Sequence, residues 1–194
     1  ELYIPDNRAI WCAGEMMHLK DVPAYAYRDF WSNKPKWQRP FYKLLSYIIA
    51  PISVSVFNNA HTIAVYHDSR SITTFRHTVS AIADGANVVI FPEHDADFNH
   101  ILCEFQEKFV DVGKLCYKRT KQVPAFVPMY LAPDLKTAYF GKPIPYPIEL
   151  GTEEARKAVC QYLTAEITRL AVEAPPHTVV PYRNQPRKTY PRNI

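Results

Sequence analysis

The pattern of apolar residues in the middle of the chain predicts a helix followed by a strand. Over residues 71–84 large apolar side chains recur every three or four positions, which is typical of an amphipathic helix with one buried face. Gly85 comes next and supplies the left-handed residue that commonly ends a helix. Asn87–Phe91 is a short apolar run rich in β-branched residues, which favours a strand covered on both faces, as in a parallel sheet. Pro92 cannot donate to a sheet, so the strand is predicted to end there.

Similar patterns predict the other elements. Strands are expected at residues 9–14, 62–66 and 123–131, and helices at residues 100–121 and 152–170. Strands that alternate with helices indicate an α/β fold. We therefore expect a single α/β domain over residues 1–173, with a mixed, mostly parallel sheet and helices on both faces. Residues 174–194 contain five prolines, four cations and no acid, and are expected to form an extended, Pro-rich basic tail.

One stretch without charges, Leu44–Phe57, is fourteen residues long. A helix that spans a bilayer needs about 20 residues, and Pro51 is expected to break this one. We therefore predict a buried or interfacial helix that does not cross a membrane and that runs into a strand at Ser53–Phe57.

Composition indicates a globular chain. It has 194 residues, of which 47% are hydrophobic and 22% charged, enough for one domain with a real core. The net charge of +4 is compatible with an anionic substrate or membrane surface and does not require nucleic acid. No Cys-x-x-Cys spacing occurs among the four cysteines, which favours reduced thiols in a cytoplasmic protein.

An unusual aromatic–basic segment, Tyr25–Tyr47, mixes large rings with cations. Its rings and cations are Tyr25, Tyr27, Phe30, Trp31, Trp37, Phe41, Tyr42 and Tyr47, with Arg28, Lys34, Lys36, Arg39 and Lys43. Such a mixture suits the headgroup region of an anionic bilayer. It also suits stacking on single-stranded nucleic acid, or rings that simply fill a core.

The polar residues after Pro92 form the strongest candidate site. They follow the carboxyl end of a predicted strand, which is where ligands bind in open α/β sheets. Metal-capable side chains are dense there, at His94, Asp95, Asp97 and His100. One hypothesis is therefore a metal-dependent phosphoesterase that uses this cluster.

Phe91, Pro92 and Glu93, placed after a helix, a glycine and a Val-Val-Ile strand, resemble the third sequence block of the glycerolipid acyltransferases. This family acylates glycerol phosphate and lysophospholipids. His94 stands where the family usually has glycine. The resemblance implies that Phe91, Pro92, Glu93 and His94 help to bind the acceptor.

The order of the surrounding segments extends this resemblance over roughly residues 9–147. Ala13–Met17 is similar to the strand and Glu-Leu-like pair that follow the family's first block. Arg70 stands after a strand, where the family has an arginine that grips the acceptor phosphate, although it could equally be a solvated residue in the first helical turn. Val123–Leu131 resembles the Val-Pro strand of the fourth block, and Gly141-Lys-Pro-Ile its downstream glycine motif.

The catalytic residues of that family are not found in this chain. The resemblance implies a His-x-x-x-x-Asp pair, in which histidine is the general base and aspartate orients it. None of the seven histidines is followed by aspartate at the fifth position. We expect the pair upstream of Glu1, within about fifty residues, since the reaction needs a positioned base. The alternative is a protein that has lost the chemistry.

The resemblance therefore implies an O-acyltransferase that moves a fatty acyl group from acyl-CoA or acyl carrier protein to a glycerol-phosphate or lysophospholipid hydroxyl. It implies no metal and no cofactor beyond the acyl thioester co-substrate. The protein is expected to be cytoplasmic and peripheral on the anionic inner membrane face, with no nucleic-acid partner. Arg70 and Glu93 are predicted to reach one pocket at the carboxyl end of Asn87–Phe91. A non-catalytic lipid-surface-binding protein remains the alternative.

Overall fold

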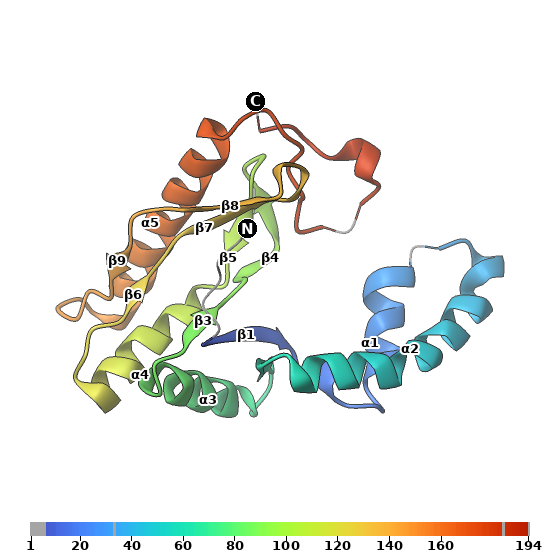
Figure 1. Ribbon diagram of the computed structural model, residues 1–194, viewed down its shortest axis with the longest axis horizontal. Coiled ribbons are helices and arrows are strands. Elements are labelled where there is room, and N and C mark those ends of the chain that lie inside the picture. Colours follow the sequence, from blue (N-terminus) through green and yellow to red (C-terminus); the bar gives the residue numbers. More distant parts are fainter. Residues whose placement is uncertain (1–6, 33, 184, 194) are drawn as a thin grey trace. The chain divides into compact units, whose positions relative to one another are not determined.

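The chain is organised as two compact units. The structure is a computed structural model that describes residues 7–32, 34–183 and 185–193. The boundary between the units lies between Ile90 and Phe91 (Figure 1). Described residues up to Ile90 form the amino-terminal unit, and those from Phe91 onwards form the carboxy-terminal unit. The single domain expected over residues 1–173 is therefore not confirmed.

A small parallel sheet forms the amino-terminal unit's centre. Its strands are β1 (Arg8–Ala13), β2 (Thr62–Val65) and β3 (Asn87–Val89), in the order β2-β1-β3. Ile10 on β1 pairs with Thr62 on one side and with Val89 on the other. The coarse prediction of an α/β arrangement with parallel strands is confirmed. β3 is shorter than predicted and ends before Phe91.

The helices of this unit follow β1 and β2. They are η1 (Gly14–Met17), α1 (Val22–Ala26), the π-helical turn η2 (Tyr27–Trp31), η3 (Lys36–Gln38), α2 (Arg39–Asn59) and α3 (Ser71–Ala83). α3 matches its prediction, and Gly85 follows it with a φ of +86°. The Thr78 hydroxyl accepts a hydrogen bond from Trp11 Nε1 at 2.8 Å, and Thr74 donates to the Ala64 carbonyl at 2.7 Å. Buried threonines thus fasten α3 to β1 and β2.

α2 differs from its prediction. It is one helix of 21 residues that continues through Pro51, so the predicted break and the strand at Ser53–Phe57 are wrong. Proline removes one backbone hydrogen bond, at a cost of about 3 kcal/mol in a helix interior. Packing on both sides of Pro51 offsets this cost, because Ala50 and Val54 lie against a cluster that contains Met16 and Val22. Tertiary contacts, rather than the local sequence, therefore allow α2 to continue through Pro51.

The carboxy-terminal unit contains three antiparallel strand pairs among its described residues. They are β4 (Glu93–Phe98) with β5 (Cys103–Phe105), β6 (Ala125–Phe126) with β9 (Ile144–Pro145), and β7 (Met129–Ala132) with β8 (Thr137–Phe140). The remaining elements are η4 (Glu107–Val110), α4 (Asp111–Thr120), η5 (Pro133–Leu135), α5 (Thr152–Glu173) and η6 (Arg187–Thr189). The one continuous mixed sheet that we expected is not found. The helix predicted over residues 100–121 is also wrong in its first half, which forms β5 and η4.

The Pro-rich tail belongs to the carboxy-terminal unit. His177 is buried, and its Nε2 lies 2.6 Å from the Tyr130 hydroxyl on β7. Its Nδ1 lies 2.7 Å from the Pro175 carbonyl, which can only accept, so Nδ1 carries the proton and Nε2 accepts from Tyr130. The His177 N–H donates to Asn193 Oδ1, and Asn193 Nδ2 donates to the Ala171 carbonyl of α5. The tail is therefore extended but held against the unit.

Candidate functional site

The carboxyl ends of β1 and β2 bring together the first candidate site. Tyr66, just after β2, lies against Gly14, just after β1. A Cβ placed on Gly14 would lie 2.3 Å from the Tyr66 ring, so a larger residue there would displace the ring. The Tyr66 hydroxyl is 3.0 Å from Nε2 of His18. These ends of parallel strands are the usual ligand-binding edge of an α/β sheet.

Arg70 is oriented by two neighbours in this site. Its guanidinium carbon lies 4.0 Å from the centre of the Tyr66 ring, which is a cation–π geometry. Its Nε and Nη2 donate to the Asp68 carboxylate at distances of 2.8 to 3.1 Å. Asp68 Oδ1 also accepts from the Arg70 backbone N–H at 2.8 Å. Since these bonds use Nε and one N–H of Nη2, the edge formed by Nη1 and the second N–H of Nη2 can bind an anion without displacing Asp68.

Electrostatics keep this pair charged. The hydrogen bonds from Arg70 hold the pKa of Asp68 below its ordinary value, and those same bonds raise the pKa of Arg70. Both side chains are about half exposed, at 52% and 55%, so a solvent-borne anion can reach them. Arg70 stands at the N-cap position of α3, and Asp68 accepts its backbone N–H, so the alternative of a solvated arginine at the helix start stays open.

The sequence predicts Arg70 as a site residue but does not identify the residues that surround it. Gly14 and His18 are distant from Arg70 along the chain, and His18 and Tyr66 are 48 residues apart, whereas Tyr66 precedes Arg70 by only four residues. The available signal was that a glycine ends one predicted strand and a tyrosine ends another. Parallel neighbours would bring those two positions to the same edge.

Phe91, Pro92, Glu93 and His94 lie at the start of the carboxy-terminal unit. Glu93 begins β4, and its carboxylate accepts a hydrogen bond from the Cys103 N–H at 2.9 Å. Burial raises the pKa of Glu93 above its ordinary value. Phe91 is exposed, whereas Pro92, Glu93 and His94 are half-buried. One carboxylate oxygen of Glu93 is therefore already engaged in a hydrogen bond within the β4–β5 hairpin.

Arg70 and Glu93 belong to different units, Arg70 to the amino-terminal one and Glu93 to the carboxy-terminal one. The expectation that both reach one pocket stays a prediction.

The proposed metal cluster is not assembled. Among the described residues no group of three or more His, Cys, Asp or Glu side chains could hold a metal ion. Asp95 forms an ion pair with Arg183 of the tail. His100 lies in the turn between β4 and β5, with a φ of +75°, where Asn99 accepts the next two backbone N–H groups. The acidic segment is half of a hairpin, so the metal-dependent alternative loses its structural motivation.

A groove of about 710 Å³ lies within the carboxy-terminal unit, beside β4, β5 and α5. Its lining includes Cys103 and Cys160, and neither Arg70 nor Glu93 contributes to it. Burial raises the pKa of both thiols, that of Cys160 to about 12. A thiol must be a thiolate to act as a nucleophile. This groove is therefore unsuited to cysteine chemistry.

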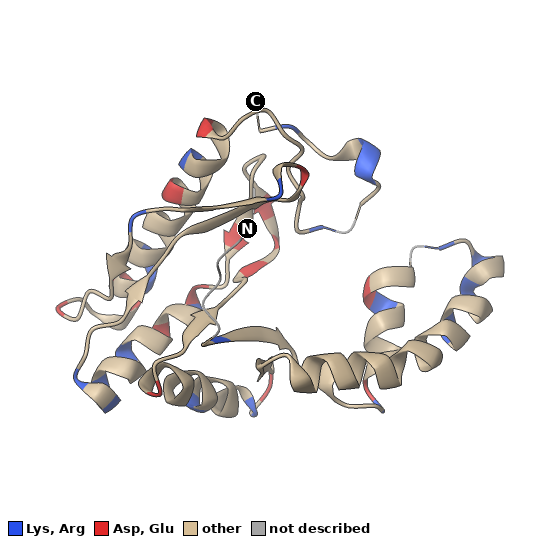
Figure 2. Cartoon of the chain, in the orientation of Figure 1, with Lys and Arg blue, Asp and Glu red and all other residues tan. Residues whose placement is uncertain are grey.

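The aromatic–basic segment is a surface rather than a core. None of its eight rings is buried, and Trp37, the most exposed, is 79% accessible. Trp31 packs on Tyr42 with 5.5 Å between ring centres, and the Lys34 ammonium lies 5.7 Å from the Tyr42 ring. The cations of this segment lie on η2, on η3 and in the first turns of α2, with Lys34 between η2 and η3 (Figure 2). The alternative that these rings simply fill a core is therefore not supported, although Tyr25 packs against the cluster of Met16, Val22 and Ala50.

No protein-family model, no curated protein and no solved structure matches this chain.

Proposed function

We propose that this chain forms part of a glycerolipid-type O-acyltransferase and binds the phosphate of the acceptor. Its donor would be acyl-CoA or acyl carrier protein, and its acceptor glycerol phosphate or a lysophospholipid. The acceptor hydroxyl oxygen bonds to the acyl carbon and the carbon–sulfur bond breaks. A general base takes the hydroxyl proton, and the thiolate that leaves is protonated to a thiol. The base would come from a His-x-x-x-x-Asp pair preceding Glu1.

One observation carries the proposal: Arg70 stands at the carboxyl end of a parallel strand with its guanidinium already oriented. Tyr66 stacks on one face and Asp68 binds one edge, so less side-chain entropy is lost when a phosphate binds. A guanidinium edge matches phosphate oxygens better than an ammonium group does. The order of segments around it supports the same conclusion, since Phe91, Pro92 and Glu93 follow in the order that the resemblance to the family implies.

The test is acyl transfer by the full-length gene product with two acceptors, lysophosphatidic acid and a monoacylglycerol that lacks the phosphate. Arg70→Ala should raise KM for lysophosphatidic acid by more than about tenfold, since charge-assisted hydrogen bonds contribute about 1.5–3 kcal/mol. KM for the monoacylglycerol should not change. Arg70→Lys should recover only part of the loss, because a lysine cannot bind bidentately.

Arg76→Ala is the matched control, because Arg76 is an exposed arginine on α3, six residues further along. Its kinetics should match those of the wild type. Equal effects of Arg70→Ala on both acceptors would remove the phosphate role. No acyl transfer by a protein that contains all residues encoded upstream of Glu1 would remove the enzyme proposal itself.

Glu93 needs a gentler substitution than alanine. Glu93→Ala would leave the Cys103 N–H without its acceptor and so disturb the hairpin. Glu93→Gln keeps an oxygen acceptor and removes only the charge. If Glu93 orients the acceptor, Glu93→Gln lowers kcat/KM while the melting temperature stays level or rises. An unchanged kcat/KM would restrict Glu93 to its role in the β4–β5 hairpin.

A non-catalytic lipid-surface protein is the second candidate, and the exposed rings of the aromatic–basic segment favour it. On either proposal the protein would be cytoplasmic and peripheral on an anionic membrane face. Lipid binding without acyl transfer by the full-length protein would favour this second candidate.

A further inference from the structure

α2 exposes its large apolar side chains and buries its small ones. The α2 outer face consists of Phe41, Leu44, Tyr47, Ile48, Ile52 and Val56, each more than half exposed. On the opposite side the helix buries Ser46 and Ala50. A surface helix in water normally shows the reverse arrangement. Single exposed apolar residues are common, but a continuous stripe over four turns indicates a surface that something covers.

The charges of this region mark one end of the helix. Lys34, Lys36, Arg39 and Lys43 lie at or before the first turns of α2, and Leu44–Asn59 contains no charged residue. No Asp or Glu occurs between Asp29 and Asp68. Figure 2 shows the body of α2 without charge, with its cations at the start. The region is therefore complementary to an anionic surface.

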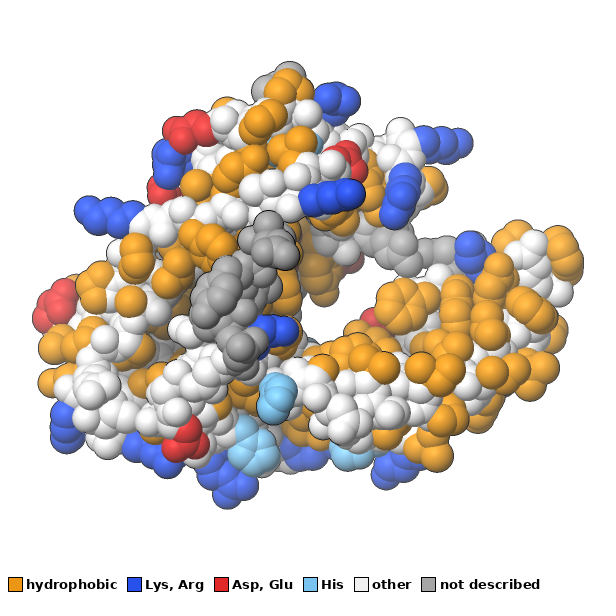
Figure 3. All heavy atoms as spheres, in the orientation of Figure 1, with side chains coloured by type: hydrophobic (Ala, Val, Ile, Leu, Met, Phe, Trp, Pro, Cys, Tyr) orange, Lys and Arg blue, Asp and Glu red, His pale blue; other side chains and the backbone are white. Residues whose placement is uncertain are grey.

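Rings accompany the cations at that same end. Trp37, Phe41 and Tyr47 are exposed there, and Figure 3 shows hydrophobic side chains over most of the visible surface of α2. Aromatic rings and long cationic side chains with an apolar body behind them are the composition of proteins that lie in the membrane interface. A partner that offered only acidic protein side chains would leave the stripe from Ile48 to Val56 uncovered.

We propose that α2 lies in the plane of an anionic phospholipid leaflet, with the α2 outer face among the acyl chains and the four cations at the headgroups. This deepens the proposed function, since a membrane-resident acceptor requires docking, but its test does not require acyl transfer. Residues 36–59 are long and apolar enough to cross a membrane by length and composition. The in-plane orientation is favoured because the inner face packs on Met16 and Val22, which tie it to η1 and α1. Spanning would carry those short irregular elements into hydrocarbon.

Vesicle co-sedimentation tests the surface directly. Wild-type protein should bind phosphatidylglycerol-containing vesicles more tightly than pure phosphatidylcholine vesicles. Leu44→Gln combined with Ile48→Gln and Ile52→Gln should weaken binding more than about 100-fold, because three large apolar side chains no longer enter the leaflet. Glutamine keeps a helix propensity close to that of leucine. Each cation neutralised by Lys36→Gln or Lys43→Gln should cost about fivefold with anionic vesicles at low salt.

The matched control carries three glutamines at exposed apolar positions elsewhere, Ile72, Val172 and Val180. Its binding should stay within about threefold of the wild type, as expected for surface substitutions. In a background that carries Trp31→Phe and Trp37→Phe, the fluorescence of Ile52→Trp should be quenched by lipids with brominated acyl chains, and that of Ile72→Trp should not.

Three results would overturn the proposal. The first is wild-type protein that binds neither kind of vesicle. The second is a Leu44, Ile48 and Ile52 variant that binds as the wild type does. The third is a dimer in sedimentation velocity without lipid that this variant dissociates, which would assign the outer face to a second copy of the chain. Loss of acyl transfer in Arg70→Ala with vesicle binding intact separates this surface from the proposed phosphate site.

Discussion

α2 and α5 have almost the same length, 21 and 22 residues, but they place their apolar residues on opposite sides. α5 buries Val159 and Leu163 and keeps its charges outside. α2 buries Ser46 and Ala50 and keeps its largest apolar residues outside. Hydrophobicity alone does not say which face of a helix is inside, because the answer depends on what lies on each side. The outer side of α5 carries charged side chains, as is usual for a helix that faces water. The outer side of α2 carries large apolar side chains, as is usual for a helix that faces an apolar environment.

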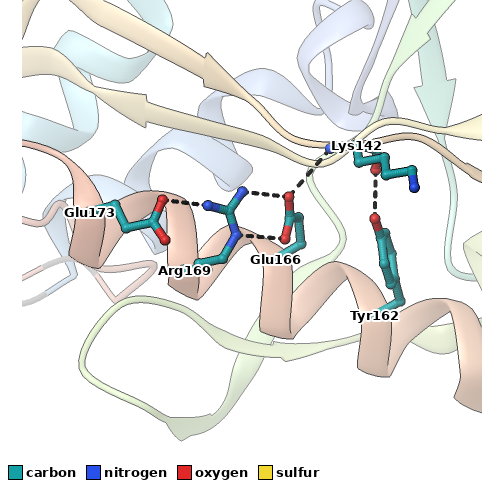
Figure 4. Close-up of polar contacts among 5 residues, drawn as sticks. All are labelled: Lys142, Tyr162, Glu166, Arg169 and Glu173. Carbon is teal, nitrogen blue, oxygen red and sulfur yellow. Dashed lines mark hydrogen bonds and ion pairs between the residues drawn. The ribbon is translucent and has the colours of Figure 1, made fainter.

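The polar surface of α5 is organised by ion pairs, whereas Leu44–Asn59 of α2 contains no charged residue. Arg169 binds Glu166 at 2.7 and 2.9 Å and also pairs with Glu173 (Figure 4). Glu166 in turn accepts from the Lys142 N–H at 3.3 Å, and Tyr162 donates to the Lys142 carbonyl at 2.9 Å. A Cβ on Gly141 would lie 2.6 Å from the Glu166 side chain. The glycine of the Gly-Lys-Pro-Ile motif thus has a packing role beside α5.

The largest expected difference between the two helices comes from truncating one apolar residue on each. Leu163→Ala in α5 should lower the free energy of unfolding by about 2–5 kcal/mol, because it leaves a cavity in a closed core. Ile48→Ala on the α2 outer face should change it by less than about 0.5 kcal/mol in the absence of lipid. Urea denaturation of both variants measures this. Comparable losses would mean that a part of the chain covers Ile48 in solution.

A smaller effect should follow from enlarging one residue on each side of α2. Ser46→Leu forces a large side chain into a fully buried position of α2, and overpacking of this kind costs about 1–3 kcal/mol. Ile52→Leu on the outer face should be neutral, within about 0.5 kcal/mol. Thermal denaturation without lipid checks both. A tolerated Ser46→Leu would show that the inner face is loosely packed.

The smallest effect concerns pH and sharpens the contrast in charge. Arg169 lowers the pKa of Glu166 to about 2, below the value expected in the unfolded chain. A depressed folded-state pKa adds stability above the unfolded pKa of about 4.3, and that stability is lost as pH falls towards 2. Arg169→Ala should therefore have a lower free energy of unfolding than the wild type at pH 6. This difference in free energy of unfolding should become smaller between pH 5 and pH 2. Lys43→Ala on α2 is the control. Its difference from the wild type in free energy of unfolding should not become smaller in that pH range.

Local patterns were sufficient where one face of an element meets a closed core and the other meets water. α3 with Gly85, α5, β1 and β2 were predicted on this basis, and the structure contains them. Local sequence patterns did not predict the structure correctly where contacts between residues far apart in the sequence determine it. Pro51 does not break α2, because packing against Met16 and Val22 holds the helix on both sides of it. β5 was assigned to a helix, although Asn99 and the left-handed His100 are residues typical of a tight turn.

The candidate site was predictable in part. The order of segments placed Arg70 after a strand, and the structure places it there. Its stacking on Tyr66 is a local contact four residues back, but the close approach of Gly14 to Tyr66 joins residues that follow separate strands, which one-dimensional spacing does not encode. The acids after Pro92 were interpreted as a ligand site because they follow the carboxyl end of a predicted strand. They form β4, where Glu93 accepts a backbone N–H of the partner strand.

The hydrogen bonds by which Asn193 links His177 to α5 have a practical consequence for dividing this chain into fragments. A boundary drawn at Glu173, where composition changes, would remove both His177 and Asn193. The Tyr130 hydroxyl would then lose its partner, and the Ala171 carbonyl near the end of α5 would lose the Asn193 donor. A recombinant carboxy-terminal fragment should instead run past Asn193, with any affinity tag placed at its other end.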